Sequence, residues 1–391
     1  MHLARKLWQR GLDLLPTAGF HFDRPLVLLQ SDDWGRAGLR DHKGLEQLRN
    51  SGVNLGDRPY DFYTLETEED LFALREVLAR HGDSMGRHPC LEMNFIVANL
   101  DLAKYPFDGQ NLPFLPLADG LPPGWNRPNL VNGYLGGIAE GVFHPALHGT
   151  SHFCQISVVR AMVGNGERAK LLRTFWKAGA TYVHWRMPWI GYEYWDPQER
   201  EDDRFLSRSS QSELIAHTVG AFAKLFSMLP LSACAPGYRA NEDTVCAWAQ
   251  HGIRVAQNGP GALIPPHLDS NEVLQLFRTI EFEPATDENF ALNSCLQQAE
   301  ACFAHGIPAV VSIHSINFHS TVKDFRSRTL RLLDEFLTSI ESRHKKLLYL
   351  HDAQLWELVR NGVCRTPSGD VRVSVTKKKF TRAEIARQSV V

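Results

Sequence analysis

The feature that most constrains the fold of this chain is the alternation of short apolar runs with segments of helical periodicity. Continuous apolar runs are typical of strands buried on both faces; they lie at residues 25–30, 91–100, 231–235, 253–257, 308–314 and 347–350. Between them, apolar residues recur at helical spacing, most clearly at Ile215, Val219, Phe222, Phe226 and Leu229. Weaker patterns indicate further strands at 138–147 and 181–185 and one helix at about 157–178. Strands that alternate with helices predict parallel βαβ units.

The strand candidates extend over most of the 391 residues without a break in composition, which favours one closed or nearly closed barrel over two open sheets. We therefore expect an α/β fold, a TIM-like barrel with loop insertions, over residues 25–364. Residues 105–134 are rich in Pro, Gly and Asn, and residues 185–208 carry aromatic residues among charges, so both segments are expected to be insertions. Residues 1–24 are predicted to form an N-terminal helical extension, and residues 365–391 a basic C-terminal tail.

Composition excludes several classes of protein. Lys and Arg total 42 against 44 for Asp and Glu, so the balance gives no reason to expect nucleic-acid binding. No run approaches the ~18 apolar residues that an integral membrane span needs. The first 20 residues lack the apolar core of a signal peptide, and the seven Cys residues form no CxxC pair. These observations predict a cytoplasmic protein without a disulfide framework or a Cys-rich zinc site.

Chemically capable side chains follow three of the predicted strands. Asp32 and Asp33 end the first strand, His148 and His152 follow the strand at 138–147, and His314 ends the strand at 308–314. In parallel α/β folds, active residues lie at the carboxyl ends of strands. Successive residues at a strand end point in different directions, so one Asp can bind a metal while the other faces the substrate.

Two His residues four positions apart, together with one carboxylate, can bind a metal and leave positions open for water and substrate. A His at a neighbouring strand end, such as His314, is suited to act as a general acid beside that metal. Asn317 follows in the same loop, where it can orient His314 or touch the substrate. The sequence therefore predicts a metal-dependent hydrolase.

In this order, the three motifs resemble those of the polysaccharide deacetylase family, the family 4 carbohydrate esterases with a chitooligosaccharide deacetylase homology domain. Residues 31–35 read SDDWG and are similar to the family's T-F-D-D-G. Residues 148–152 read HGTSH and are similar to H-[ST]-x-x-H, in the variant with Gly after the first His. Residues 312–314 are similar to the last motif, and the resemblance covers about residues 25–359.

The resemblance implies a distorted (β/α)7 barrel and an enzyme that removes an N-acetyl group from an amino sugar or glycoconjugate. Asp32 would be the general base and His314 the general acid. Asp33, His148 and His152 would bind one divalent ion, with zinc expected first and cobalt, nickel or manganese as alternatives. The implied partner is a small-molecule or glycoconjugate substrate, and the products are acetate and a free amine.

The middle motif departs from the family, because Cys234 stands where an Arg should orient the catalytic Asp. Arg239 can replace that Arg from the next turn, or Arg186 can do so from the run 186–189, which reads RMPW. The segment around Pro236 fits the order of strands and helices better, which makes the Arg186 segment an aromatic insertion near the mouth of the site. Trp34, Tyr238 and Trp189 are candidates for stacking on sugar faces.

Three functions stay open at this point. The first is the metal-dependent deacetylase. The second is an amidohydrolase that uses the same metal site on a non-sugar amide, or a glycosidase, which would need a second carboxylate across the cleft. The third is a catalytically silent carbohydrate-binding protein, and the absent middle Arg is its main support.

Overall fold

The computed structural model describes residues 16–107, 111–164, 166–259, 263–366 and 369–381. Its strands are β1 (Thr17–Phe22), β2 (Leu26–Trp34), β3 (Leu91–Ile96), β4 (Ala98–Leu100), β5 (Phe114–Pro116), β6 (Phe143–Gly149), β7 (Ser232–Cys234), β8 (Val255–Asn258), β9 (His267–Leu268), β10 (Leu274–Phe277), β11 (Ile280–Glu281), β12 (Ala309–His314), β13 (Leu348–Tyr349), β14 (Val363–Thr366), β15 (Gly369–Arg372) and β16 (Val375–Phe380). Its α-helices are α2 (His42–Asn50), α3 (Glu68–Ala79), α4 (Leu130–Ala139), α5 (Gln155–Met162), α6 (Glu167–Lys177), α7 (Arg208–Phe226), α8 (Glu242–Gln250), α9 (Leu292–Ala304), α10 (Arg326–Arg343) and α11 (Asp352–Asn361).

One large sheet organises the described part of the chain, in the order β11-β12-β2-β3-β6-β7-β8-β10-β9-β1-β16. The strands from β11 to β10 pair in parallel, and β9, β1 and β16 continue the sheet with antiparallel pairings. Within residues 274–281, β10 pairs with β8 and β11 pairs with β12, so this run connects the two ends of the parallel part of the sheet. The predicted α/β class is therefore confirmed and the sheet is curled, whereas the exact (β/α)7 barrel stays an expectation.

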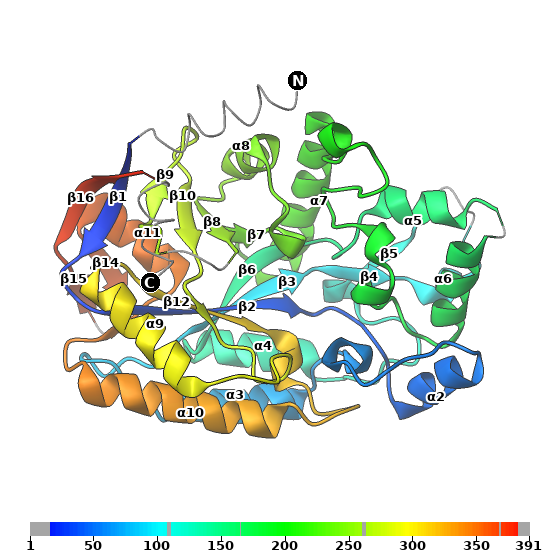
Figure 1. Cartoon of the computed structure of the whole chain (residues 1–391), viewed down its shortest axis with the longest axis horizontal. Helices are drawn as coiled ribbons and strands as arrows, with labels where there is room; N and C mark the ends of the chain where they lie inside the picture. Colours follow the sequence, from blue (N-terminus) through cyan, green and yellow to red (C-terminus); the bar gives the residue numbers. More distant parts are fainter. Residues whose placement is uncertain (1–15, 108–110, 165, 260–262, 367–368, 382–391) are drawn as a thin grey trace.

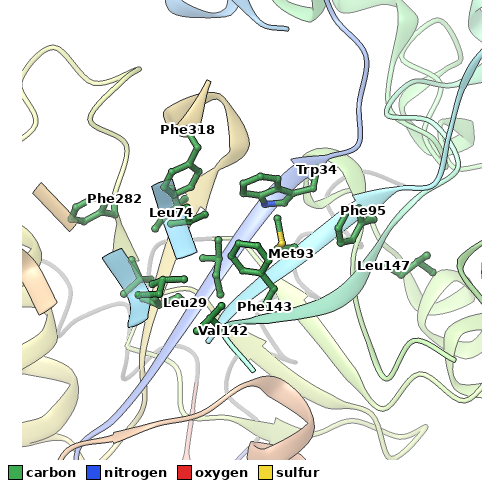
Figure 2. Packing of buried hydrophobic residues seen from close by; sticks show 14 of the residues in the cluster. Leu29, Trp34, Leu74, Met93, Phe95, Val142, Phe143, Leu147, Phe282 and Phe318 are labelled. Atoms are coloured by element: carbon green, nitrogen blue, oxygen red, sulfur yellow. The ribbon is translucent and has the colours of Figure 1, made fainter. Parts of the chain in front are cut away.

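Helices cover the outer face of the sheet. α10 packs against α3 and α9, α3 against α4, and α7 against α8; Figure 1 shows α9, α10 and α3 along one side of β2 and β3. β2 and β3 are buried along their whole length, as expected of parallel strands covered on both faces. Figure 2 shows part of the resulting core, where Leu29, Met93 and Phe143 pack together.

Three local predictions are wrong. Residues 181–185 form no strand; residues 184–186 make one 3-10 turn, and Tyr182 and Val183 pack into a cluster with α6. The helix expected at 157–178 is two helices, α5 and α6, because Gly164 adopts a φ of 95° between them, a conformation suited to glycine. Residues 17–22 of the expected helical extension are strand β1, in which Phe20 and Phe22 are buried.

The two ends of the described chain meet. β1 pairs antiparallel with β16, which lies within the predicted basic tail, so residues 375–380 belong to the sheet. Figure 1 shows these two strands side by side at one edge of the molecule. Residues 1–15 and 382–391, the rest of the expected extension and tail, lie outside the described residues. The division into three segments stays a prediction, and none of the described helices is long and apolar enough to cross a membrane.

Candidate metal centre and catalytic residues

A cavity of about 460 Å³ opens at the carboxyl ends of β2, β6 and β12. This is the position that the parallel sheet predicts for active residues. The cavity brings together the carboxylates and histidines singled out from the sequence with several aromatic side chains. Its lining residues are Asp32, Asp33, Arg36, Tyr60, His148, His152, His184, Trp185, Tyr192, Gly237, Tyr238 and His314.

The end of β2 turns two successive carboxylates toward this cavity. The pairing of β2 with β3 shifts register between Ser31 and Trp34, and Asp33 adopts a φ of 74°. A non-glycine residue in this left-handed region costs of order 1–3 kcal/mol and is held there by its surroundings. The hydroxyl of Tyr63 supports the turn by donating a hydrogen bond to the Asp33 carbonyl oxygen at 2.8 Å.

Asp33, His148 and His152 converge in the geometry of a metal site. Oδ1 of Asp33 lies 3.6 Å from Nε2 of His148 and 3.4 Å from Nε2 of His152. Arg36 holds the other carboxylate oxygen, with its Nη1 2.8 Å from Oδ2. Oδ1 is buried and has no hydrogen-bond partner among the described residues. A free carboxylate oxygen that faces two imidazole nitrogens fits a divalent cation such as zinc.

The protonation of these three groups also suits a metal. Burial acts to raise the pKa of Asp33, but the charge of Arg36 outweighs it, so that pKa lies well below its usual value. Burial lowers the pKa of His152, so its ring is neutral at neutral pH. Nδ1 of His148 lies 2.9 Å from the Cys234 carbonyl oxygen. A carbonyl only accepts, so Nδ1 carries the proton and Nε2 is left as the ligand atom.

Asp32 forms a buried ion pair with Arg278, a residue that the sequence analysis did not identify. The guanidinium donates to both carboxylate oxygens at 2.6 Å, and Arg278 is 0% exposed. Asn94 donates to Oδ1 of Asp32 at 2.7 Å. Burial acts to raise the pKa of Asp32, but the charge of Arg278 outweighs it and keeps that pKa well below its usual value. Asp32 is therefore ionised at neutral pH and fixed in orientation.

Neither of the two arginines expected to orient Asp32 contacts it. Arg186 pairs with Asp61, Nε to Oδ1 at 2.9 Å, and Arg239 stacks 4.9 Å from the centre of the Trp195 ring. The guanidinium comes instead from Arg278, which lies between β10 and β11. In the sheet, β10 is the neighbour of β8. Cys234, in the position of the missing Arg, places its Sγ 3.9 Å from Oδ2 of Asp32. Its small side chain leaves the carboxylate to Arg278.

His314 stands opposite Asp32, with Nε2 3.8 Å from Oδ2. Its Nδ1 lies 2.7 Å from Oε1 of Glu283, a second residue that the sequence analysis missed. Burial acts to lower the pKa of His314, and the Glu283 carboxylate outweighs it, which raises that pKa to about 9. Asn317 lies behind this pair and does not line the cavity; its Nδ2 donates to Glu283 at 2.6 Å and to the His314 carbonyl at 3.0 Å. It therefore orients the pair.

Of the three aromatic candidates for sugar stacking, only Tyr238 lines the cavity, and Trp189 does not. Trp34 is 0% exposed and stacks on Phe318 with ring centres 5.7 Å apart, so it belongs to the core (Figure 2). Tyr238 lines the cavity, and its hydroxyl lies 3.4 Å from Oδ2 of Asp32. Tyr60, Trp185 and Tyr192 also line the cavity.

A signal for Arg278 was present in the sequence. Leu274, Leu276, Ile280 and Phe282 alternate along the run 274–282 and are all buried. Arg278 has the same parity, so it is a charged residue among inward-facing positions of a strand. Such a residue needs a buried partner of opposite charge. No comparable pattern identifies Glu283, which acts from just beyond β11.

No protein-family model and no curated protein matches the sequence. Among solved structures, a Mycobacterium smegmatis protein described as a polysaccharide deacetylase matches with 12% identity and a TM-score of 0.48, over 89% of this chain and 95% of that one. A Pseudomonas aeruginosa protein described in the same way matches with 11% identity and a TM-score of 0.45, over 86% and 91%. A CE4 family pseudoenzyme of Bacillus anthracis matches with 11% identity and a TM-score of 0.36, over 84% and 64%.

The identities and TM-scores of these matches are too low to carry an argument about this chain. The matches also include a pseudoenzyme. A function for this chain has to come from the residues of its own cavity.

Proposed function

We propose that this chain is a metal-dependent hydrolase that removes an N-acetyl group from an amino sugar or glycoconjugate. The observation that carries the proposal is the shared cavity: Asp32 and His314 face each other beside the donor set of Asp33, His148 and His152. An ionised carboxylate, a protonated imidazole and three metal donors are the groups that hydrolysis of an amide requires.

Asp33, His148 and His152 would hold the ion. A divalent ion bound there supplies a Lewis acid for an acyl carbonyl and lowers the pKa of water. Zinc is the expected metal, and cobalt, nickel and manganese are alternatives, because imidazole nitrogen and carboxylate oxygen suit all of them.

Asp32 accepts a proton from the attacking water in this proposal. Arg278 and Asn94 leave the carboxylate one orientation, so the proton acceptor is in place before the substrate arrives. His314 is protonated at neutral pH, because its pKa is raised to about 9. It can therefore donate a proton from Nε2 to the leaving amine, while Glu283 holds Nδ1.

A sugar fits the walls of this cavity. Tyr60, Trp185, Tyr192 and Tyr238 surround the polar groups, and aromatic rings beside hydrogen-bonding groups suit the apolar faces and hydroxyls of sugars. The silent binding protein loses its main support, since the guanidinium absent at residue 234 is supplied by Arg278. An amidohydrolase acting on a non-sugar amide would use the same groups, and the choice of substrates in the assay separates the two.

Elemental analysis and acetate release test the proposal. The purified chain should contain about one divalent metal ion, and His148→Ala should lose it, whereas His217→Ala, on the exposed face of α7, should keep both metal and activity. Asp32→Asn should retain the metal and lower acetate release from N-acetyl sugars, sugar nucleotides or glycolipids by ~10²–10⁴-fold. Release from none of these, or metal content unchanged in His148→Ala, would refute the proposal.

A further inference from the structure

Glu193 is a buried carboxylate that has no role so far, either among the metal donors or beside Asp32 and His314. It lies in the segment 185–208 and is 1% exposed. Its Oε1 accepts hydrogen bonds from the backbone N–H of Thr150 at 2.8 Å and of Ser151 at 3.3 Å. Thr150 and Ser151 are two of the three residues between His148 and His152. One carboxylate oxygen therefore holds the turn that sets the spacing of two metal donors.

The third residue of this turn, Gly149, is matched to Glu193. Gly149 has a φ of 136°, which side-chain-bearing residues rarely adopt. A Cβ placed on it would lie 1.9 Å from Oε2 of Glu193. The carboxylate thus occupies the space that a Ser or Thr side chain would need at this position. This explains the glycine where the resemblance noted above has Ser or Thr.

The backbone around Glu193 is fixed on both sides. Tyr192 and Trp195 pair with each other, with N to O distances of 3.0 and 2.7 Å, and Tyr194 is 1% exposed. Tyr192 lines the cavity, so the segment that closes one wall of the site also supports the metal donors.

We infer that Glu193 is a positioning residue for the metal site: its carboxylate replaces a side chain at residue 149 and holds His148 and His152 at the spacing of two ligands to one ion. The inference rests on the proposed function, since it requires that the three donors bind a metal. Groups that orient the ligands of a metal site typically change its affinity 10–100-fold when they are removed.

Binding of Co²⁺ alone tests this inference without an activity assay. The measurements are the dissociation constant, from competition with a chelating dye, and the visible absorption of the bound Co²⁺, at pH 8, where Glu193 is mostly ionised because burial raises its pKa to about 7. Glu193→Ala should weaken Co²⁺ binding ~10–100-fold and change the absorption band. Glu193→Gln should recover most of the affinity, since its amide oxygen still accepts from both N–H groups.

Asp83→Ala is the matched control. The Asp83 carboxylate also accepts from backbone N–H groups, those of Met85 at 2.8 Å, Arg87 at 3.0 Å and Tyr349 at 3.2 Å, but it does not line the cavity. This variant should lose stability and leave the Co²⁺ dissociation constant within about twofold. Unfolding in urea, measured on each variant, separates loss of metal from loss of fold.

A second pair of variants covers the case in which Glu193→Ala does not fold. Gly149→Ala forces its Cβ onto Oε2 of Glu193 and should also weaken Co²⁺ binding, and Glu193→Gln in the same chain should not restore it. Equal affinity for Co²⁺ in wild type, Glu193→Ala and Gly149→Ala overturns the inference and leaves the proposed function standing. A wild-type chain that binds no divalent metal overturns both.

Discussion

Replacing Arg278 by Met removes the cation from the most deeply buried ion pair of the site. Arg278 is 0% exposed and holds both oxygens of Asp32, and it also donates to Gln30, Gln257 and Ser312 at 2.9–3.1 Å. Met fills much of the same volume, so the main change is a carboxylate left in the interior without its counter-charge. Removal of one partner from a buried ion pair costs about 3–5 kcal/mol. That is a large share of the ~5–15 kcal/mol by which a domain is stable.

A double-mutant cycle in urea measures this effect at pH 7. Asp32→Asn removes the stranded charge, so it should recover about 2–3 kcal/mol when added to Arg278→Met. Arg80→Met is the control, because Arg80 also pairs with a carboxylate, Asp334 at 2.9 Å, but its side chain is 58% exposed. An exposed pair contributes about 0–1 kcal/mol. Equal losses of stability from the two Arg→Met variants, or no recovery in the double variant, would refute the reasoning.

The pKa of Asp32 also determines how the free energy of unfolding depends on pH. The pKa of Asp32 lies below its ordinary value in the folded chain, so its ionised form stabilises the fold above the unfolded value of ~3.9. That contribution is lost as the pH falls through the folded pKa. In Arg278→Met, burial without the cation raises the pKa of Asp32, so protonation relieves the stranded charge as the pH falls. The difference in unfolding free energy between wild type and Arg278→Met should therefore be greatest at pH 7 and decrease as the pH falls toward 4.

The remaining predictions concern the acid, a glycine and the metal. Glu283→Gln should lower the pKa of His314 from about 9, because the Glu283 carboxylate is the main group that opposes the effect of burial; an unchanged titration of its ring signals in NMR would contradict this. The stability lost in that variant should be greatest below pH 6.5 and disappear as the pH rises above about 9. Gly237→Ala should cost ~1–3 kcal/mol in urea, since φ is 59° and the new Cβ would lie 2.3 Å from the Tyr192 ring. Gly220→Ala, in open space on α7, should be neutral or stabilising, and equal effects of the two would rule out the steric cause. Zinc at 100 times its dissociation constant should raise the free energy of unfolding by about 2.7 kcal/mol, and chelator should abolish the increase; no shift in the melting temperature would count against the metal site.

Much of the fold could be predicted because buried parallel strands are visible as apolar runs. The runs that became β2, β3, β8 and β12 were recognised with their approximate ends. The predicted strand at 181–185 was wrong because apolar residues that pack beneath a loop have the same composition as a strand. The strands of 274–281 were not recognised, since the run is short and an arginine interrupts it.

The grouping of Asp32, Asp33, His148, His152 and His314 could be anticipated for a physical reason. Side chains at the carboxyl ends of parallel strands meet at one edge of the sheet, so their order along the chain already predicts that they share a site. The partner of Asp32 could not be predicted in this way. A guanidinium on a long side chain can reach a carboxylate from several strands. The order of strands and helices favoured the segment of Arg239 over that of Arg186, and neither residue contacts Asp32.

The sequence by itself determined which strand ends carry carboxylates and histidines, and therefore that a metal-binding hydrolytic site was to be expected, because that follows from periodicity and local order. Only the tertiary structure decided which charges face each other. Arg278 reaches Asp32 because β12 and β2 are neighbours and β11 pairs with β12. Glu193 reaches the turn at residues 149–151 because the segment 185–208 folds back over it. These pairings depend on strand order and loop path, which local sequence patterns do not encode.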